Sequence, residues 1–291
     1  MSVIPLYVNR HVPDEVRRGH IFEGAVFLYS APPESRQIVS WIRDLSAQAF
    51  EGVGDVRRVH EELDVKAFVD RVGPLKSKFT NHPETKRLCQ ALVGALGSDP
   101  DTTYFDLPRL RVAPPGDYLT SGVSYAYKPH RDTWYAHPPQ LVNFWVPVYD
   151  SERSTVMSMF FDYFDKPVQN STSSWDYDDW VANARYAAAQ SVGTEKRQHP
   201  LPAESVSESL DIRIVQNAGD LMVFSSCHLH ATAPNETGLV RYSYDLRTLD
   251  IEDLRSGRGA RNIDSQATGS TLKDFLRVRD LAPLEVDAVR V

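Results

Sequence analysis

Hydrophobic and polar residues follow two different periods along the chain, and the first period is helical. In the N-terminal part, apolar residues recur every three to four positions, which is typical of helices with one buried face. Pro33 stands where a proline favours the first turn of a helix, shortly after an apolar run, GAVFLY, that predicts a strand. We therefore expect a mostly helical flank over about 1–103, with a strand over 24–29 and helices over about 33–50, 65–72 and 83–96.

The second period begins near Tyr104, where β-branched and aromatic residues replace the helical spacing and Pro and Gly separate short runs. An Ala-rich stretch over about 175–191 interrupts these runs and predicts a helical insert. About eight strands are too many for a small sheet and favour a double-sheet jelly roll or a barrel. The expected strands cover 107–113, 124–127, 141–149, 155–161, 210–215, 221–225 and 239–246.

Length and composition indicate one domain. The 291 residues are 42% hydrophobic and 24% charged, which is ordinary for a globular chain with one core. No segment has the composition of a linker that would divide the chain. The predicted single domain, 1–291, therefore consists of the helical flank, a jelly-roll core over about 104–250 and a C-terminal extension over 251–291.

Charge and cysteine content narrow the classes of function. A net charge of −7 and a pI near 5.7, without clustered Lys and Arg, argue against a nucleic-acid surface. No apolar run reaches the roughly 20 residues that cross a bilayer, and the N-terminus lacks the pattern of a secretory signal. Two isolated cysteines, Cys89 and Cys227, suit a reducing compartment. We expect a cytoplasmic protein with a small-molecule substrate, and the composition predicts no particular oligomeric state.

An early part of the predicted β core contains a histidine and an acid that one residue separates. In an extended backbone, residues i and i+2 point to one face, so His130 and Asp132 could bind the same metal ion. A histidine from a late strand would complete a two-His, one-carboxylate set, which is typical of non-haem Fe(II) oxygenases. His230 and His228 face the same way on an extended segment, and either could be that ligand.

A cation that could bind a carboxylate lies on the last predicted strand. Arg241 and Ser243 have the same parity on the segment LVRYSYDLR, so both can face inward. A planar guanidinium pairs with a carboxylate through two hydrogen bonds, and a neighbouring hydroxyl adds another. The two residues are therefore predicted to hold the distal carboxylate of a 2-oxo acid such as 2-oxoglutarate.

Other residues near the His-x-Asp motif have two interpretations each. Asn143 lies in an apolar strand, where its amide needs partners that a cosubstrate or a substrate could provide. Trp134 could form a substrate wall or part of the core. Lys128 and Arg131 could attract an anionic substrate or could belong to a solvated face.

Three segments together resemble the phytanoyl-CoA-dioxygenase-like branch of the Fe(II)/2-oxoglutarate-dependent dioxygenases. They are HRD at 130–132, GDLMVFSSCHLHATAPNETG at 219–238 and RYS at 241–243, and the resemblance covers about 107–249. It implies an α+β chain with a mainly β core, in which a cupin-like double-stranded β-helix (jelly roll) is flanked by the N-terminal helices.

The resemblance also implies a role for individual residues. It favours His230 over His228 as the distal ligand, because the family pattern places the ligand before a small residue. It further places the residue within the His-x-Asp motif, and the one two after the distal histidine, near the cosubstrate. The implied set is His130, Asp132 and His230 for iron, Arg241 and Ser243 for 2-oxoglutarate, and Arg131 and Thr232 for further contacts.

The activity that the resemblance implies uses Fe(II), 2-oxoglutarate and O2, releases succinate and CO2, and hydroxylates an unactivated C–H bond. Halide transfer is not expected, because Asp132 stands where related halogenases have Ala or Gly. Desaturation, cyclisation and epimerisation share the same ligands. A similarity of residues 130–147 to the Kdo hydroxylases suggests a sugar acid, although an amino acid, a natural-product intermediate or an acyl-thioester would fit the scaffold as well.

The substrate is therefore expected to be a small or medium polar metabolite, with an anionic one favoured by Lys128 and Arg131. Two other hypotheses belong to different classes. One is a cupin-type metalloenzyme that does not use 2-oxoglutarate, and the other is a non-catalytic jelly-roll binding module. The intact ligand set and Arg241 argue against both.

Overall fold

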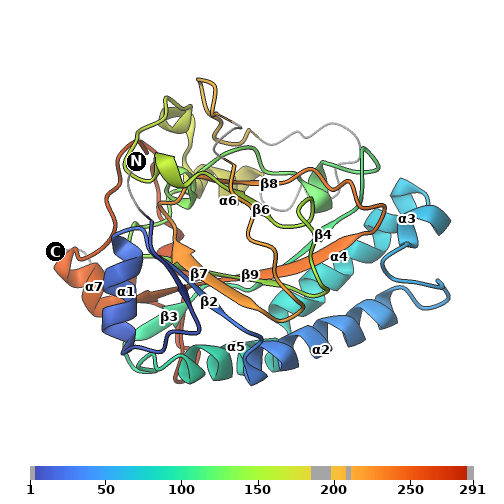
Figure 1. The fold of residues 1–291 in the computed structure, drawn as a ribbon, viewed down its shortest axis with the longest axis horizontal. Helices are drawn as coiled ribbons and strands as arrows, with labels where there is room; N and C mark the ends of the chain where they lie inside the picture. Colours follow the sequence, from blue (N-terminus) through green and yellow to red (C-terminus); the bar gives the residue numbers. More distant parts are fainter. Residues whose placement is uncertain (1–3, 185–197, 208–210, 287–291) are drawn as a thin grey trace.

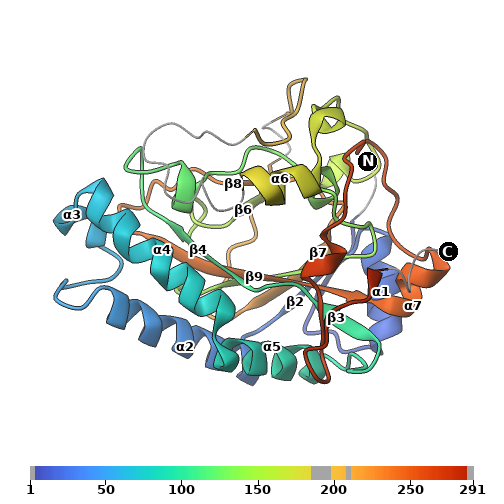
Figure 2. The ribbon, with the colours of Figure 1, turned by 180° about the vertical axis from the view of Figure 1, so that it is seen from behind.

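The computed structural model describes residues 4–184, 198–207 and 211–286, and these form layers (Figures 1 and 2). Three long helices lie under a large sheet, and a small sheet with helix α6 lies above it. The helices are α1 (Asp14–Phe22), α2 (Pro33–Ala49), α3 (Val59–Glu62), α4 (Val65–Asn81), α5 (Pro83–Ala95), α6 (Tyr177–Asn183) and α7 (Ile251–Ser256). A mixed α+β fold with a large sheet is thus confirmed.

The large sheet has eight strands within the described residues and is antiparallel except for one edge pair. Its order is β1-β2-β7-β5-β9-β3-β10, and β4 pairs with β9 beside this path. The small sheet pairs β6 with β8. The strands are β1 (Leu6–Val8), β2 (Val26–Tyr29), β3 (Thr103–Phe105), β4 (Arg109–Ala113), β5 (Val142–Pro147), β6 (Met157–Met159), β7 (Leu221–Ser225), β8 (His230–Thr232), β9 (Arg241–Asp250) and β10 (Leu276–Arg277).

Strand β9 separates the hydrophobic core from the polar interior. Successive side chains of a strand point to opposite faces. Tyr242, Tyr244 and Leu246 are almost fully buried in the main core with residues of the long helices. Arg241, Ser243, Asp245 and Arg247 have the opposite parity and face the space below the small sheet. One strand thus packs the core and supplies a row of polar side chains to the other face.

Helix α4 extends beyond its predicted end. The sequence predicted a helix over about 65–72, but the helix continues through Pro74 to Asn81. A proline inside a helix removes one backbone hydrogen bond and clashes with the preceding turn. Leu75 and Phe79 follow Pro74 and are buried in the main core, at 3% and 0% exposure. Burial of these two side chains outweighs the local cost, because tertiary packing supplies most of the stability of a helix.

Two predicted strands were wrong within the described residues. Residues 124–127 follow a 3-10 turn, Gly122–Ser124, that the backbone N–H of Ser124 closes on Ser121 O. Residues 211–215 make one isolated bridge, between Ile212 and Met159, and Ile212 and Val215 are half exposed. β-Branched composition alone therefore predicted these two strands wrongly, because no neighbouring strand pairs with either segment along its length. The helical insert is confirmed as α6 up to Asn183, and 185–191 lie outside the described residues.

Several short elements escaped prediction. Helices α1, α3 and α7 and strands β1, β3, β8 and β10 have between two and nine residues each. Segments of this length carry too few residues to display a period. No helix among the described residues is long and apolar enough to span a membrane.

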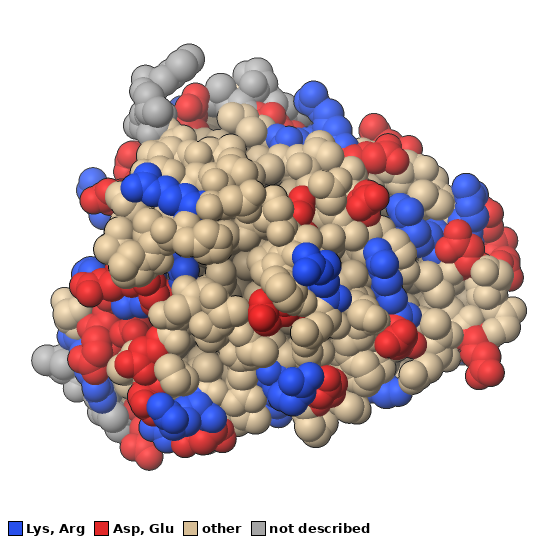
Figure 3. Space-filling view, turned by 60° about the horizontal axis from the view of Figure 1, so that its bottom comes forward, with Lys and Arg blue, Asp and Glu red and all other residues tan. Residues whose placement is uncertain are grey.

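Acidic and basic side chains are interspersed on the face that Figure 3 shows, in which the lower side of Figure 1 comes forward. On the helices, some of these charges pair between neighbouring turns, as Lys66 does with Asp70 at 2.6 Å and Arg87 with Glu84 at 2.7 Å. Such exposed pairs add little stability. The ion pairs that matter for stability therefore lie inside the molecule.

The C-terminal segment after α7 anchors the loop that follows the predicted metal ligands. Asp264 accepts hydrogen bonds from Arg131 Nε at 2.9 Å, from Trp134 Nε1 at 2.7 Å and from Val168 N at 3.0 Å. The side chains of Arg131 and Asp264 are only 1% and 4% exposed. Ser265 Oγ donates to Thr133 O at 2.7 Å. A buried ion pair thus joins the C-terminal extension to the core.

Replacement of Asp264 by Asn should therefore destabilise the fold strongly. The change keeps the shape but leaves the Arg131 guanidinium buried without a counter-charge, which costs about 3–5 kcal/mol of the free energy of unfolding. Urea denaturation followed by circular dichroism measures the loss. Asp280→Asn is the control, because Asp280 pairs with Arg277 at the surface and its loss should change stability far less. Equal losses in the two variants would contradict the anchoring role.

Candidate metal centre

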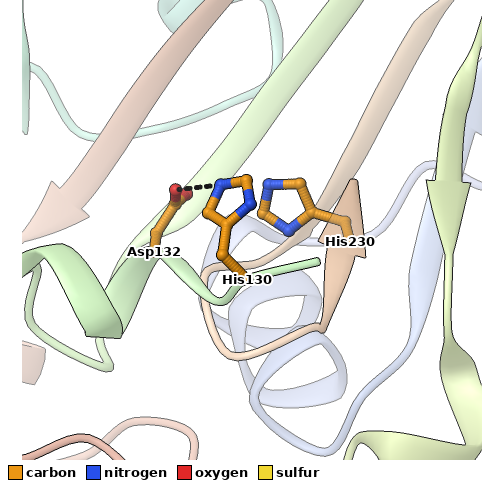
Figure 4. A group of neighbouring side chains, drawn as sticks. All are labelled: His130, Asp132 and His230. Atoms are coloured by element: carbon orange, nitrogen blue, oxygen red, sulfur yellow. Dashed lines mark ion pairs between the residues drawn. The ribbon is translucent and has the colours of Figure 1, made fainter. Parts of the chain in front are cut away.

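Three buried side chains, those of His130, Asp132 and His230, meet between the large and the small sheet. One potential ligand atom from each lies within 4.8 Å of the others. His130 Nε2 is 4.0 Å from Asp132 Oδ1, and the two imidazole centroids are 4.4 Å apart. Figure 4 shows the carboxylate and the two rings side by side. The structure therefore brings together the three residues that the sequence pattern selected.

Backbone pairing brings the two histidines together although they are far apart in sequence. His130 and His230 form an isolated antiparallel bridge in which each N–H donates to the other's carbonyl at 2.9 Å. Arg131 has extended angles, φ −107° and ψ 151°, so the side chains of His130 and Asp132 project to the same side. Asp132 then starts a 3-10 turn, Asp132–Tyr135, and its N–H donates to Ser226 O at 3.0 Å.

Hydrogen bonds to backbone carbonyls orient both imidazoles. Nδ1 of His130 lies 2.8 Å from Lys128 O, and Nδ1 of His230 lies 3.0 Å from His228 O. A carbonyl only accepts, so each Nδ1 donates a hydrogen and each Nε2 is the ring nitrogen that could bind a metal. Burial, and then the neighbouring His230, lower the pKa of His130 to about 3. Metal-binding histidines are commonly held in this way, with the second nitrogen fixed by a carbonyl.

The carboxylate of Asp132 uses its two oxygens differently. Oδ2 accepts from Asn143 Nδ2 at 2.6 Å and from Arg247 Nε at 3.3 Å, whereas Oδ1 faces His130. Burial by itself would raise the pKa of Asp132, but Arg247 and the nearby histidines outweigh it and hold this pKa well below its usual value. The carboxyl is therefore ionised, and one oxygen remains available as a ligand.

Arg241 and Ser243 carry hydrogen-bond donors for which no other described residue provides an acceptor. Nε and Nη1 of Arg241 are buried without a hydrogen-bond partner, and so is Oγ of Ser243. Burial, and then the like charge of Arg111, lower the pKa of Arg241 to about 10, so the group is still a cation at neutral pH. Buried polar groups are nearly always hydrogen-bonded, and unpartnered ones are costly. The arrangement calls for an anionic acceptor.

A cavity of about 290 Å³ is lined by the three potential metal ligands and by Arg241. Charged residues of β4 and β9 form one part of the lining, and aromatic residues form another. Tyr127 and Tyr135 belong to the aromatic part, and their ring centroids lie 5.1 Å and 5.4 Å from that of His130. The metal centre therefore lies at the junction of a charged and an aromatic surface.

Two other predicted residues also line this cavity. Thr232 is on β8, and its Oγ1 accepts from Tyr127 N at 3.1 Å. Asn143 is on β5, and its Oδ1 is buried without a partner while its Nδ2 is bonded to Asp132. The free atom of Asn143 is an acceptor, so it suits a hydroxyl or a water better than a carboxylate.

The residues predicted to contact a substrate lie elsewhere. Arg131 alternates with the two ligands and so points away from the cavity, where it donates to Asp264 and to the carbonyls of Cys227, Tyr163 and Lys166. Trp134 is fully buried and bonded to Asp264, and Lys128 is exposed outside the cavity. The structure therefore does not bring these three residues, predicted to contact a substrate or cosubstrate, into the cavity lining.

His228 is separate from the metal centre. Its Nε2 lies 2.9 Å from Gly24 O, and its ring packs against Phe161 and Phe164. The turn between Ser225 and His228 is closed by a hydrogen bond from His228 N to Ser225 O, so this segment is not extended up to His228. Of the two candidates left open by the residue pattern, the structure places His230 beside His130 and Asp132.

Sequence reasoning missed a group of charged residues in the cavity wall. Arg247 pairs with Asp106 at 2.8 Å, and Arg111 pairs with Asp245 at 2.7 Å. Extending the alternation that selected Arg241 and Ser243 would have reached Asp245 and Arg247 on the same face. Asp106 carried no such signal, because its role depends on the tertiary pairing of β3 and β4 with β9.

Comparison with known proteins finds matches only by structure. No family model and no curated protein matches the sequence. EvdO2 from Micromonospora carbonacea var. aurantiaca, solved in complex with 2-oxoglutarate, matches with 15% identity and a TM-score of 0.46 over 86% of this chain and 94% of that chain. The epimerase SnoN, in complex with Fe3+, alpha ketoglutarate and nogalamycin RO, matches with 13% identity and a TM-score of 0.43 over 91% and 100%.

ThoJ, a non-heme monooxygenase in complex with Ni, matches with 14% identity and a TM-score of 0.36 over 81% of this chain and 79% of that chain. At identities of 13–15% and TM-scores below 0.5, these matches assign no function to this chain.

Proposed function

We propose that this chain is a non-haem Fe(II)- and 2-oxoglutarate-dependent oxygenase with a double-stranded β-helix core. The observation that carries the proposal is the combination inside one cavity of two imidazoles, one ionised carboxylate and a guanidinium whose buried Nε and Nη1 have no hydrogen-bond partner. A two-His, one-carboxylate set suits Fe(II) and leaves coordination positions open. The two sheets that face each other across the cavity are the arrangement such a core requires.

His130 Nε2, His230 Nε2 and Asp132 Oδ1 are the atoms proposed to hold the metal. They suit it because backbone carbonyls fix both Nδ1 hydrogens and because Asp132 Oδ2 is already bonded to Asn143 and Arg247. Bound iron would supply, with O2 and 2-oxoglutarate, the oxidation of a substrate C–H bond coupled to release of succinate and CO2. The protein's contribution is to orient the reactants and to exclude water.

Arg241 and Ser243 are proposed to bind the distal carboxylate of 2-oxoglutarate. Their free donors are Arg241 Nε and Nη1 and Ser243 Oγ, which match a carboxylate acceptor. Arg111, the like charge near Arg241, is already paired with Asp245, so an anion here would offset the charge of Arg241 itself. A metalloenzyme without 2-oxoglutarate, or a binding module without a metal, would leave these donors or the three ligands unexplained. Thr232 lines the same cavity and would lie near the cosubstrate.

Hydroxylation of a small or medium polar metabolite is the proposed outcome. Lys128 and Arg131 lie outside the cavity, so they do not favour an anionic substrate. Arg109 and Arg111 do line it, but they pair with Asp106 and Asp245. Asn143 Oδ1 is a free acceptor beside the metal ligands, which favours a substrate that carries a hydroxyl.

Loss of the Arg241 guanidinium should weaken 2-oxoglutarate binding. Under anaerobic conditions, the Fe(II)-loaded protein should develop the weak visible absorption band of iron-bound 2-oxo acid when 2-oxoglutarate is added. In Arg241→Leu, the concentration of 2-oxoglutarate at half-saturation should rise about 100-fold, which corresponds to about 3 kcal/mol of charge-assisted hydrogen bonding. Arg255→Leu is a matched surface control and should titrate like the wild type. A wild-type protein without the band would refute the proposal.

Asp132→Ala should lose most of the affinity for Fe(II), because it removes the anionic ligand and leaves only the two imidazoles. Equilibrium dialysis followed by metal analysis measures the bound iron, and thermal melting confirms that the variant is folded. His228→Asn is the matched control, because His228 lies outside the three-residue group and should not affect metal content. The reverse result, metal lost in His228→Asn and kept in Asp132→Ala, would show that the ligand set is wrong.

A further inference from the structure

Arg247 connects the metal-binding carboxylate to a second buried acid. Its Nε lies 3.3 Å from Asp132 Oδ2 and its Nη1 lies 2.8 Å from Asp106 Oδ2. Asp106 is 1% exposed, and Arg247 and Asp132 are 7% and 4% exposed. A buried guanidinium between two buried carboxylates is a costly arrangement unless its geometry is well defined. The three residues therefore form one buried, ion-paired unit.

The fold fixes Arg247 independently of any metal. The N–H of Arg247 donates to Asp106 Oδ1 at 3.0 Å, and the N–H of Asp106 donates to Arg247 O at 2.9 Å. With the bond from Nη1, three hydrogen bonds join the same two residues. The strand register adds a further restraint, because Arg247 lies opposite Asn143 in the pairing of β9 with β5. The guanidinium is thus held in place by β9, β5 and the residue that follows β3.

Arg247 and its register partner Asn143 both bind the same oxygen of Asp132. Asn143 Nδ2 reaches Oδ2 at 2.6 Å, and Arg247 Nε reaches it at 3.3 Å. A buried carboxylate without such donors could rotate and offer both of its oxygens to a cation, as carboxylates do in bidentate metal sites. With Oδ2 engaged by two donors, only Oδ1 faces the histidines.

The charge of Arg247 is permanent in this setting. Burial alone would lower the pKa of Arg247, but Asp132, Asp106 and Asp245 outweigh burial and the opposing charge of Arg111, and they raise it. Arg109 also approaches Asp106, at 3.5 Å, but its ion pair is with Asp106 and not with Asp132. Among these cations in the described cavity wall, Arg247 is therefore the one in direct contact with the proposed metal ligand.

We infer that Arg247, held by Asp106 and assisted by Asn143, is a positioning residue that restricts Asp132 to one metal-binding oxygen. The inference rests on the proposed function, because it needs a metal at the His130, Asp132 and His230 group. Its consequence is that one coordination position, which a second carboxylate oxygen would otherwise fill, stays free for the 2-oxo acid. The role is one of orientation, since the side-chain contacts of Arg247 are with Asp132, Asp106 and Asp245.

Co(II) binding to the metal-free protein tests this role without turnover, since the visible absorption of protein-bound Co(II) depends on its coordination. Two variants are compared with the wild type. Arg247→Lys keeps the positive charge but loses the guanidinium that reaches both Asp132 and Asp106. The double variant Arg247→Met with Asp106→Asn removes the positive charge and the Asp106 charge together. The affinity for Co(II) should fall about 10-fold in the first and about 100-fold in the second, within the range seen when groups that orient metal ligands are removed.

The absorption spectrum of bound Co(II) should change in the same order, with the lysine variant closer to the wild type. A merely structural role would lower the melting temperature without changing the spectrum. Arg109→Met is the matched control, because Arg109 shares Asp106 and the cavity wall but does not touch Asp132, so affinity and spectrum should remain those of the wild type.

Three outcomes would overturn the inference. Either folded Arg247 variant with wild-type affinity and spectrum would refute it while the proposed function stands. An Arg109→Met protein that changes as much as the Arg247 variants would show that the charge of the wall, and not contact with Asp132, is responsible. A wild-type protein that binds no Co(II) would refute the proposed function and the inference together.

Discussion

The two backbone hydrogen bonds between His130 and His230 are the constraint on which the proposed site depends. They join an early loop to strand β8 across the space between the two sheets, and they set the distance between the imidazoles before any metal is present. The carbonyls of Lys128 and His228, each two residues before a histidine, then orient the rings. Ligand geometry is therefore a property of the local backbone, which the C-terminal segment holds through Arg131 and Asp264.

Strand β9 links stability and proposed activity in one element. Its tyrosines and Leu246 pack against the long helices, so the strand cannot shift without disrupting the core. The opposite parity carries Arg241 at the cosubstrate end and Arg247 at the ligand end. One alternating run thus fixes the spacing between the proposed anchor for 2-oxoglutarate and the residue that orients Asp132. All ten of its residues are in antiparallel register with β3, β4 or β5, which prevents slippage.

Much of this arrangement was predictable because it depends on local periodicity. Strand β7, helix α2 and the convergence of His130 with Asp132 follow from spacing along the chain. Arg131 was misjudged although the same alternation places it on the opposite face. The choice of His230 over His228 needed the family pattern, and the structure then gave the physical reason, a tight turn before His228.

Other features had no local signal at all. Asp106 is one aspartate among many in the sequence, and only the pairing of β3 and β4 with β9 brings it to Arg247. Helix α4 passes Pro74 because distant core residues receive Leu75 and Phe79. Residues 124–127 have the composition of a strand but no partner strand. In each case the deciding interaction joins residues far apart in sequence, which periodicity cannot register.

The most direct test of the account is anomalous diffraction at the iron absorption edge from crystals grown anaerobically with Fe(II) and 2-oxoglutarate. The account predicts one anomalous peak within bonding distance of His130 Nε2, His230 Nε2 and a single oxygen of Asp132. It also predicts density for 2-oxoglutarate that extends from this peak to Arg241 and Ser243. A peak at another site, a peak bound by His228, or 2-oxoglutarate density that does not reach Arg241 would contradict it.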